Sequence, residues 1–249
     1  MRLWIGSVLL LSAGSARADH VHTVEHADHA FGAGVSMLAA AFDTTLYVGN
    51  YQGVVPSLHW SNDRFAAGAS VALYRLERNG ASVYGFGDIV VHGQATLVGD
   101  HDLHAGVIVA ASAPIGDELR GMGMGHPMVM PAAFGVWTLD RVGLSATAGY
   151  SRALGANAEH DHGMWPLVEP MNMVELTWSA GGAYAVTPHV QAGARFSGGY
   201  PIGNGDNRVV GALRVGYASG RYATAAELQA GLAGDPFTVR GVVSTALSF

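Results

Sequence analysis

Apolar residues alternate with small or polar residues along most of the chain, from Phe31 onward. A period of two over segments of about ten residues is typical of transmembrane β-strands, whose side chains face lipid and barrel interior in turn. The C-terminal stretch FTVRGVVSTALSF shows the alternation most clearly. It predicts an outer face made of Phe237, Val239, Val243, Leu247 and Phe249. The inner face would then carry Thr238, Arg240, Ser244 and Ser248.

Two further stretches, RVVGALRVGY at 208–217 and VELTWSAGGAY at 174–184, alternate in the same way. In the first, Leu213 and Val215 share one face and Arg214 lies on the other. In the second, Trp178 faces outward and Glu175 inward. A soluble β-sandwich also alternates, but its polar face would carry many Lys and Glu residues, whereas these faces carry mostly Gly, Ala and Ser. The sequence therefore predicts an all-β protein, a transmembrane antiparallel up-and-down β-barrel.

Turn residues divide the chain into twelve candidate strands. The short turns are predicted at 61–64, 99–102, 139–141, 187–189 and 219–221. The strands would start near Phe31, Gln52, Phe65, Phe86, Leu103, Pro127, Val142, Met173, Val190, Arg208, Tyr222 and Phe237. Longer connections alternate with the short turns, apart from a short one near Gly234; they are predicted at 43–51, 77–85, 114–126, 153–172 and 200–207. This pattern is typical of bacterial outer-membrane barrels, and it predicts one barrel over residues 31–249 with both termini in the periplasm.

The first eighteen residues, MRLWIGSVLLLSAGSARA, have the features of a secretory signal peptide. The apolar run from Leu3 to Leu11 is too short to span a bilayer, and an A-x-A-like site ends at Ala18. We expect residues 1–18 to be removed, which leaves a His-rich periplasmic tail at 19–30. The C-terminal Phe249 is typical of the residue that the outer-membrane assembly machinery recognises, so the cell outer membrane of a Gram-negative bacterium is the predicted location.

Composition agrees with lipid contact. Hydrophobic residues make up 49% of the chain and charged residues only 13%, so apolar surface must face something other than water. The absence of cysteine excludes a disulfide framework and thiolate metal sites. The net charge of −6 provides no basic field for nucleic acid. The expected partners are outer-membrane lipids, the assembly machinery and a small-molecule or metal solute.

The middle of the chain carries motifs at its predicted strand ends. YGFGDIVVHGQATLV (84–98) opens with a G-x-G-D strand start at Gly85, Gly87 and Asp88, and AGVIVAASAPIGD (105–117) closes in a P-x-G-D turn. GMGMGHPMVMPAAFGVW (121–137) and SATAGYSRAL (145–154) add a Gly-rich loop and a strand that ends near a G-Y pair. With these motifs, residues 84–154 resemble the outer-membrane family of meta-pathway phenol-degradation proteins. The resemblance implies a barrel that moves small, often hydrophobic molecules; His- and Met-rich loops are not part of the family's pattern.

The N-terminal tail DHVHTVEHADH is the first candidate metal site. Imidazoles interleaved with carboxylates suit Zn, Cu(II) or Ni, and one tail could wrap an ion with several nitrogens. The candidate ligands are His20, His22, His26 and His29. The alternative is a solvated leader with no fixed role, and no cofactor is required by the sequence.

The stretch GMGMGHPMVMP at 121–131 is the second candidate, because sulfur and imidazole donors recur there at every second residue. Such a set suits Cu(I) or Ag(I). Met128 and Met130 are in phase with Phe134 and Val136, which we expect on the lipid side. That leaves as loop ligands Met122, Met124 and His126. The loop at 153–172 adds His160, His162 and Met164, and the two loops could meet over the barrel mouth. Flexible loops whose methionines fill gaps are the alternative.

The barrel lumen is the third candidate site. Strand parity places on the inner wall His59, Asp88, His92, His104, Glu175, Arg195, Arg208, Arg214, Glu227 and Arg240. The arginines gather on predicted strands nine, ten and twelve and the histidines on strands two, four and five, which would divide the wall electrostatically. Arg–Glu pairs that only satisfy one another are the alternative.

The sequence favours a channel over an enzyme. GMGMG leads into a strand, so it is not a dinucleotide fingerprint, and EHDH at 159–162 has no nucleophile at a defined spacing. An outer-membrane hydrolase is therefore only a minor alternative. The leading hypothesis is an outer-membrane channel for small solutes, with metal binding at its loops and tail. The rival is a closed structural or ligand-binding barrel that transports nothing.

Overall fold

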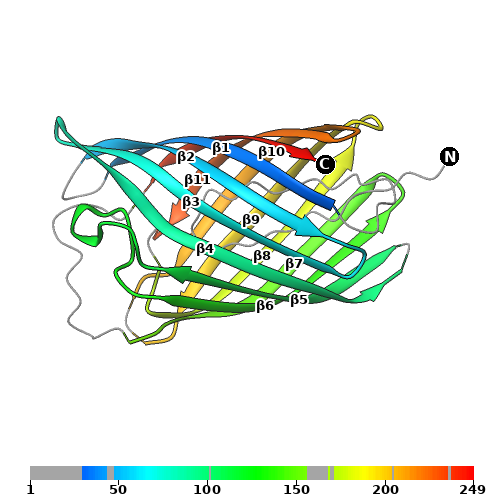
Figure 1. Ribbon diagram of the computed structural model, residues 1–249, viewed down its shortest axis with the longest axis horizontal. Coiled ribbons are helices and arrows are strands. Elements are labelled where there is room, and N and C mark those ends of the chain that lie inside the picture. Colours follow the sequence, from blue (N-terminus) through cyan, green and yellow to red (C-terminus); the bar gives the residue numbers. More distant parts are fainter. Residues whose placement is uncertain are drawn as a thin grey trace.

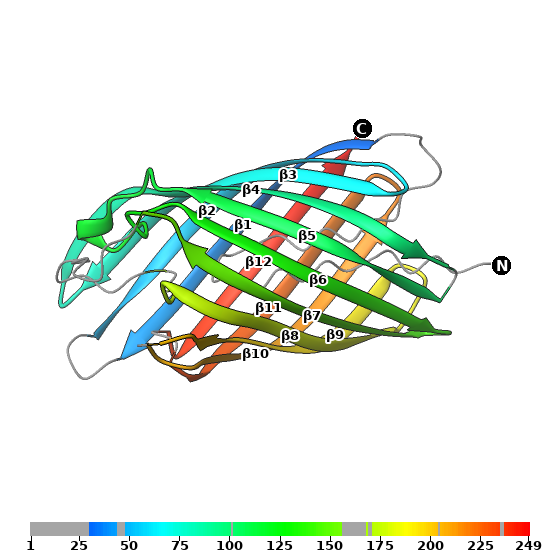
Figure 2. The ribbon, with the colours of Figure 1, turned by 90° about the horizontal axis from the view of Figure 1, so that it is seen from below.

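The computed structural model describes residues 30–43, 48–100, 102–155, 168, 171–203, 205–234 and 237–249. Twelve antiparallel strands close into one barrel, in which each strand pairs with its sequence neighbours and the first pairs with the last (Figures 1 and 2). The strands are β1 (Ala30–Asp43), β2 (Val48–Ser61), β3 (Phe65–Arg78), β4 (Ala81–Gly99), β5 (Leu103–Ala113), β6 (Met128–Leu139), β7 (Val142–Ala153), β8 (Val174–Ala185), β9 (Val190–Pro201), β10 (Arg208–Ser219), β11 (Tyr222–Ala233) and β12 (Val239–Ser248). The predicted all-β up-and-down barrel of twelve strands is confirmed.

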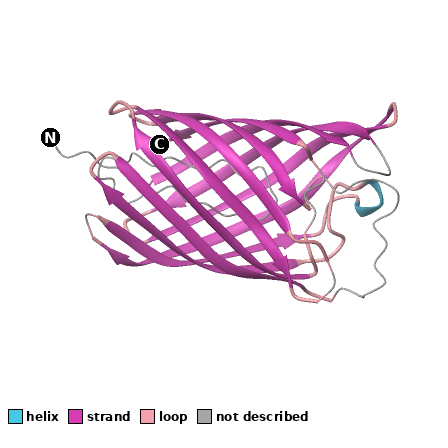
Figure 3. Cartoon of the chain, turned by 180° about the vertical axis from the view of Figure 1, so that it is seen from behind, coloured by secondary structure: helices cyan, strands magenta, loops and turns pink. Residues whose placement is uncertain are grey.

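The two ends of the barrel differ. β1 begins and β12 ends at one end, which we call the terminal end; the opposite end we call the loop end. A single turn of 3-10 helix, η1 (Glu118–Arg120), lies at the loop end (Figure 3) and is the one helical element in the described residues. Within the described residues, no helix has the length and apolar character needed to cross a membrane.

One predicted connection is wrong. The sequence pattern suggested a long connection at 77–85, but β3 and β4 are joined by Asn79 and Gly80 alone. Both residues have positive φ, 48° and 83°, as the two central positions of a type I′ hairpin turn require. Asn-Gly is the preferred pair at these positions, so this tight turn was readable from the sequence.

The outer face of the barrel is apolar and ends in aromatic residues. Exposed aromatic side chains gather toward the terminal end of the strands, as in the aromatic girdle of a membrane barrel. Of those that the structure describes, seven lie at that end: Phe31, Phe65, Trp137, Tyr184, Tyr217, Tyr222 and Phe249. The other exposed aromatic residues among those described are Tyr84, Phe86 and Tyr200, which lie nearer the loop end, and Trp178 and Phe196, which lie between. Large exposed apolar side chains are costly in water, so this face fits a lipid environment.

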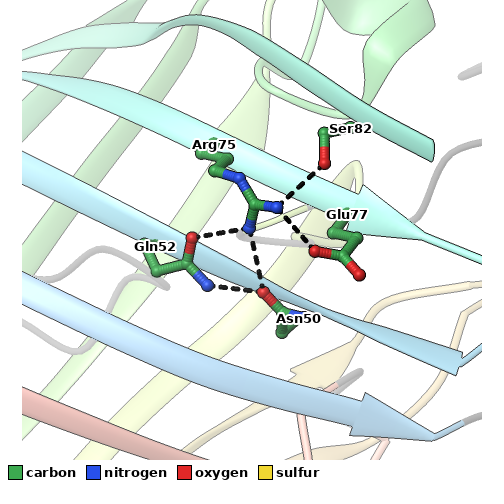
Figure 4. Close-up of polar contacts among 5 residues, drawn as sticks. All are labelled: Asn50, Gln52, Arg75, Glu77 and Ser82. Atoms are coloured by element: carbon green, nitrogen blue, oxygen red, sulfur yellow. Dashed lines mark hydrogen bonds and ion pairs between the residues drawn. The ribbon is translucent and has the colours of Figure 1, made fainter. Parts of the chain in front are cut away.

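A sharp polar boundary closes the apolar belt at the loop end of β2–β4. One cross-strand row, Met37, Val54, Leu73 and Phe86, is apolar and exposed. Beyond it, although Val48 and Tyr84 are still exposed, a group of outward polar side chains is hydrogen-bonded: Arg75 Nη1 donates to Gln52 Oε1 at 2.9 Å, and Arg75 Nη2 to Ser82 Oγ at 2.9 Å (Figure 4).

The apolar outer surface between the terminal-end aromatic residues and this polar boundary is about as tall as the apolar layer of a membrane. Ten residues separate Phe65 from Arg75 on β3. At about 3.4 Å per residue and a tilt of about 40°, they correspond to about 26 Å, close to the apolar band of about 25 Å in outer-membrane barrels.

Two predicted facings are wrong. Met128, Met130, Phe134 and Val136 were expected on the lipid side, but they are buried inside, while the outer face of β6 carries Pro131, Ala133, Trp137 and Leu139. Both faces of β6 are apolar, so hydrophobicity could not decide which face points inward. Phe237 is also buried, whereas Thr238 is exposed, because β12 begins only at Val239 and the strand alternation does not reach them.

The loop end of the barrel interior is packed by an apolar cluster. It is built mainly from the inward residues of β1, β2 and β3, with Met122, Val168 and Phe237 added from the connections at that end. Leu76 and Tyr51 are among its fully buried members. The rest of the interior combines polar and small residues with two smaller apolar clusters on β5 and β6, one around Met128 and Met130 and one of Ile108, Phe134 and Val136.

Candidate functional site

The structure places all ten lumen candidates on the inner face of the barrel. Their strand neighbours of opposite parity, such as Val107, Leu213 and Val239, are exposed on the outer face. The ten are divided between two walls: His59, Asp88, His92 and His104 on β2, β4 and β5, and Glu175, Arg195, Arg208, Arg214, Glu227 and Arg240 on β8–β12.

A continuous hydrogen-bonded chain crosses one side of this interior; we call it the inner polar chain. Arg240 Nη1 donates to the Tyr51 hydroxyl at 3.2 Å, and Arg240 Nε to Gln229 Oε1 at 2.6 Å. Gln229 in turn donates to Glu227 Oε1, which also accepts from Arg195 Nη2 at 2.7 Å. The chain thus links β2, β12, β11 and β9 through five polar side chains.

Small residues make the inner polar chain possible. In the row of paired strand positions that holds Tyr51 and Arg240, Ala40 lies between the two. In the same row Ala212 lies between Gln229 and Arg195. The long side chains can therefore lie across the wall and meet one another, so each charge is hydrogen-bonded as burial requires.

An ion pair lies farther toward the loop end. Arg208 Nη2 and Glu175 Oε1 are 2.5 Å apart, and their side chains are only 8% and 0% exposed. Asn172 Nδ2 donates to the other carboxylate oxygen at 2.8 Å. A methyl group at Gly199 would lie 2.4 Å from Glu175 Oε2, so the neighbouring strand needs glycine at this point. Glu175 on β8, Gly199 on β9 and Arg208 on β10 therefore position the ion pair together.

The formal charges make the β8–β12 wall positive. It carries four arginines (Arg195, Arg208, Arg214, Arg240) and two glutamates (Glu175, Glu227), an excess of two positive charges. Phe237 lies beside this wall, with the Arg240 guanidinium carbon 4.3 Å from its ring centroid. The inner polar chain therefore borders the apolar cluster directly.

Asp88 anchors the connection between β5 and β6. The pairing of β3 with β4 shifts between Val71 and Leu73, where a bulge at Gly87–Asp88 changes the parity of β4 and turns Asp88 inward. Its carboxylate accepts from the Gly116 N–H at 3.0 Å and from the Met124 N–H at 2.9 Å. Both ends of this connection are thus tied to one side chain.

The glycines of the G-x-G-D motif make room for that connection. A methyl group at Gly85 would lie 2.6 Å from the Met122 sulfur, and one at Gly87 would lie 2.7 Å from the Tyr74 ring. The motif therefore has a structural role: two glycines accept Met122, and the aspartate holds the backbone on either side of it.

The predicted surface position of the 121–126 ligands is wrong. Met122, Met124 and His126 are buried, because Asp88 holds their connection against the inner wall. The remaining proposed ligands (His20, His22, His26, His29, His160, His162 and Met164) lie outside the described residues. Within the described part of the chain, no three or more His, Cys, Asp or Glu side chains are grouped so that they could hold a metal ion.

Sequence reasoning missed three members of these polar networks. Tyr51 was assigned to a connection because the start of β2 was placed at Gln52 instead of Val48. Gln229 shares the parity of Glu227 and could have been found by extending the same rule. Asn172 lies outside any strand, and no sequence signal connected it to Glu175.

Comparisons with known proteins show the fold. No family model matches the chain, and no curated protein matches it, so the meta-pathway resemblance rests on its motifs alone. The KdgM porin has a TM-score of 0.57 at 8% identity, covering 87% of this chain and 99% of that one. The translocator domain of autotransporter NalP from Neisseria meningitidis has a TM-score of 0.55 at 11% identity, over 91% and 90%. The β domain of the Bordetella autotransporter Brka has a TM-score of 0.52 at 16% identity, over 88% and 100%. The fold is therefore that of outer-membrane β-barrels.

Proposed function

We propose that this protein is an outer-membrane channel for small solutes. The observation that carries the proposal is the inner polar chain, a connected series of charged and polar side chains on the inside of a barrel whose outside is apolar. Charges are expensive to bury, and in membrane barrels they gather where an aqueous path runs through the interior. The outer membrane, its lipids and its assembly machinery are the corresponding location and partners.

The positive excess on the β8–β12 wall supports a preference for anions. A cationic wall raises the local concentration of anions and lowers that of cations. The structural neighbour KdgM is a porin, and one of its structures is a complex with disordered oligogalacturonate. For the present chain we propose small anionic solutes, with Arg214 and Arg195 as the wall positions that attract them.

A closed, ligand-binding barrel is the second candidate. The apolar cluster at the loop end favours it, because Leu76 and Tyr51 are fully buried there and the 114–127 connection is tied inward by Asp88. In this alternative the polar chain stabilises the wall and passes no solute. The two candidates differ in whether ions cross the barrel.

Single-channel recording from purified protein in planar bilayers tests the proposal. We expect stepwise conductance and, in a salt gradient, a reversal potential that shows anion preference. Arg214→Gln should shift the reversal potential toward zero, because the inner wall loses a positive charge. Arg152→Gln, on the outer face, should leave the reversal potential unchanged. Absence of steps in protein that is folded by circular dichroism would overturn the channel and favour the closed barrel.

The metal link proposed for the tail and loops is separate from the channel. It is supported only by the donor chemistry of the His-rich tail and of the His/Met stretch at 159–164. Its test is metal binding by purified protein, because conductance does not report on it.

A further inference from the structure

The inner face of β6 brings methionines together at one place. Met128 and Met130 are 1% and 5% exposed and form one buried cluster with Ala110 of β5. Met171, from the connection that precedes β8, packs against the same cluster. Three methionine side chains from two distant parts of the chain therefore pack in one cluster.

The strand register explains this convergence. Met130 pairs with Ala110, and Met128 pairs with Ser112, whose hydroxyl accepts the Met128 N–H at 3.2 Å. Both partners on β5 are small, so they leave space on the inner face for the long methionine side chains. On the other side, Met128 pairs with Ala153 of β7, and the Ala153 N–H donates to the Met173 carbonyl at 2.7 Å. That bond holds the segment carrying Met171 against β7, the strand next to β6, and Met171 packs from there against the cluster.

Three of the seven methionines that the structure describes lie in this cluster. Of the methionines that the structure describes, only Met37 lies on the outer face of a strand. The others, in sequence order, are Met122, Met124, Met128, Met130, Met171 and Met173. Elsewhere the apolar interior is built mainly from Leu, Ile, Val, Ala, Phe and Tyr, with Met122 as the methionine of the cluster at the loop end. Leucine would fill similar space, so what methionine adds is a soft sulfur donor.

We propose that Met128, Met130 and Met171 form a binding site for a soft monovalent metal ion, Cu(I) or Ag(I), on the inner wall of the barrel. Thioethers select Cu(I) and disfavour harder ions. The Asp88 carboxylate on β4, separated from β6 by β5 alone, supplies negative charge on the same wall. The site shares no residue with the inner polar chain, so it stands whether or not the barrel conducts ions.

Silver titration of the full mature chain tests this site. Leucine nearly conserves the volume of methionine, so Met128→Leu/Met130→Leu/Met171→Leu should keep the fold, as checked by circular dichroism and heat-dependent gel mobility. We expect this variant to bind one Ag(I) fewer than wild type. The matched controls are Met37→Leu on the outer face and Met122→Leu, which packs in the other apolar cluster; both should bind as wild type does. Equal binding by the triple variant and wild type would show that these methionines only fill space.

X-ray absorption of wild-type protein with one equivalent of Cu(I) gives a result that needs no variant. Sulfur scatterers around copper are expected, and they should disappear in the triple Leu protein. Copper surrounded only by nitrogen and oxygen would overturn the site. Loss of silver binding in Met122→Leu equal to that in the triple variant would also overturn the assignment to this cluster.

Discussion

The carboxylate of Asp88 accepts the backbone N–H of Met124 at 2.9 Å, across 36 residues of sequence. The same side chain accepts the Gly116 N–H, so one residue of β4 closes the whole connection between β5 and β6. Because the carboxylate holds the two backbone segments together, the buried position of Met122 between them depends on it.

Asp88→Asn should therefore loosen the 114–127 connection. Asparagine has one acceptor oxygen, and its NH₂ group cannot accept the second N–H, so we expect a loss of about 1.5–3 kcal/mol in local stability. Hydrogen exchange at Gly116 and Met124 measures it directly. Asp117→Asn, in the exposed cap of η1, is the control. Unchanged protection of these amides in Asp88→Asn would show that the two hydrogen bonds to Asp88 do not stabilise the connection.

Gly87→Ala should destabilise the barrel more than Gly93→Ala does. A methyl group at Gly87 would lie 2.7 Å from the Tyr74 ring, whereas at Gly93 nothing lies within 4 Å. Overpacking of a tight interior costs about 1–3 kcal/mol. Urea unfolding in detergent compares the two, and equal unfolding midpoints would contradict the steric role assigned to the G-x-G-D motif.

Glu175→Gln should be strongly destabilising, because it leaves the Arg208 charge buried without its carboxylate. Removal of one partner of a buried ion pair costs about 3–5 kcal/mol. Glu77→Gln removes a carboxylate from the outward Arg75 pair, which is much more exposed, and should have a far smaller effect. The comparison is made by equilibrium unfolding, and a Glu175→Gln protein as stable as Glu77→Gln would contradict it.

Val215→Arg should impair folding where Arg214→Ala does not. Val215 faces outward on β10 and Arg214 inward, and a charge at mid-bilayer on the lipid face costs about 2–4 kcal/mol. The chain has no cysteine, so single cysteines at 213 and 214 can be labelled cleanly in vesicles. A membrane-impermeant reagent that modified only position 213 would reverse the assigned facing.

Removal of residues 19–29 should leave the barrel folded, because β1 begins at Ala30. It should lower the amount of Cu(II) or Zn(II) bound at neutral pH, since four histidines are lost with the segment. Isothermal titration calorimetry measures the number of metal ions bound per protein. Unchanged metal binding would show that the tail is a solvated leader.

The sequence by itself determined the number of strands, the barrel class and the inward arginines, because a period of two is a local property and one face of most strands is plainly polar. The arginines at 208, 214 and 240 were placed correctly for that reason. Asn79-Gly80 also carried a local signal, although its tight turn was not predicted.

Only the tertiary structure decided the facing of Met128 and Met130, the burial of Met122 and the meeting of Met171 with β6. β6 is apolar on both faces, so its parity depends on what its neighbours place inside the barrel. The position of the 114–127 connection depends on Asp88, which a β-bulge turns inward. These contacts join residues far apart in the chain, so the local alternation of polar and apolar residues cannot predict them. They form only when the barrel has closed.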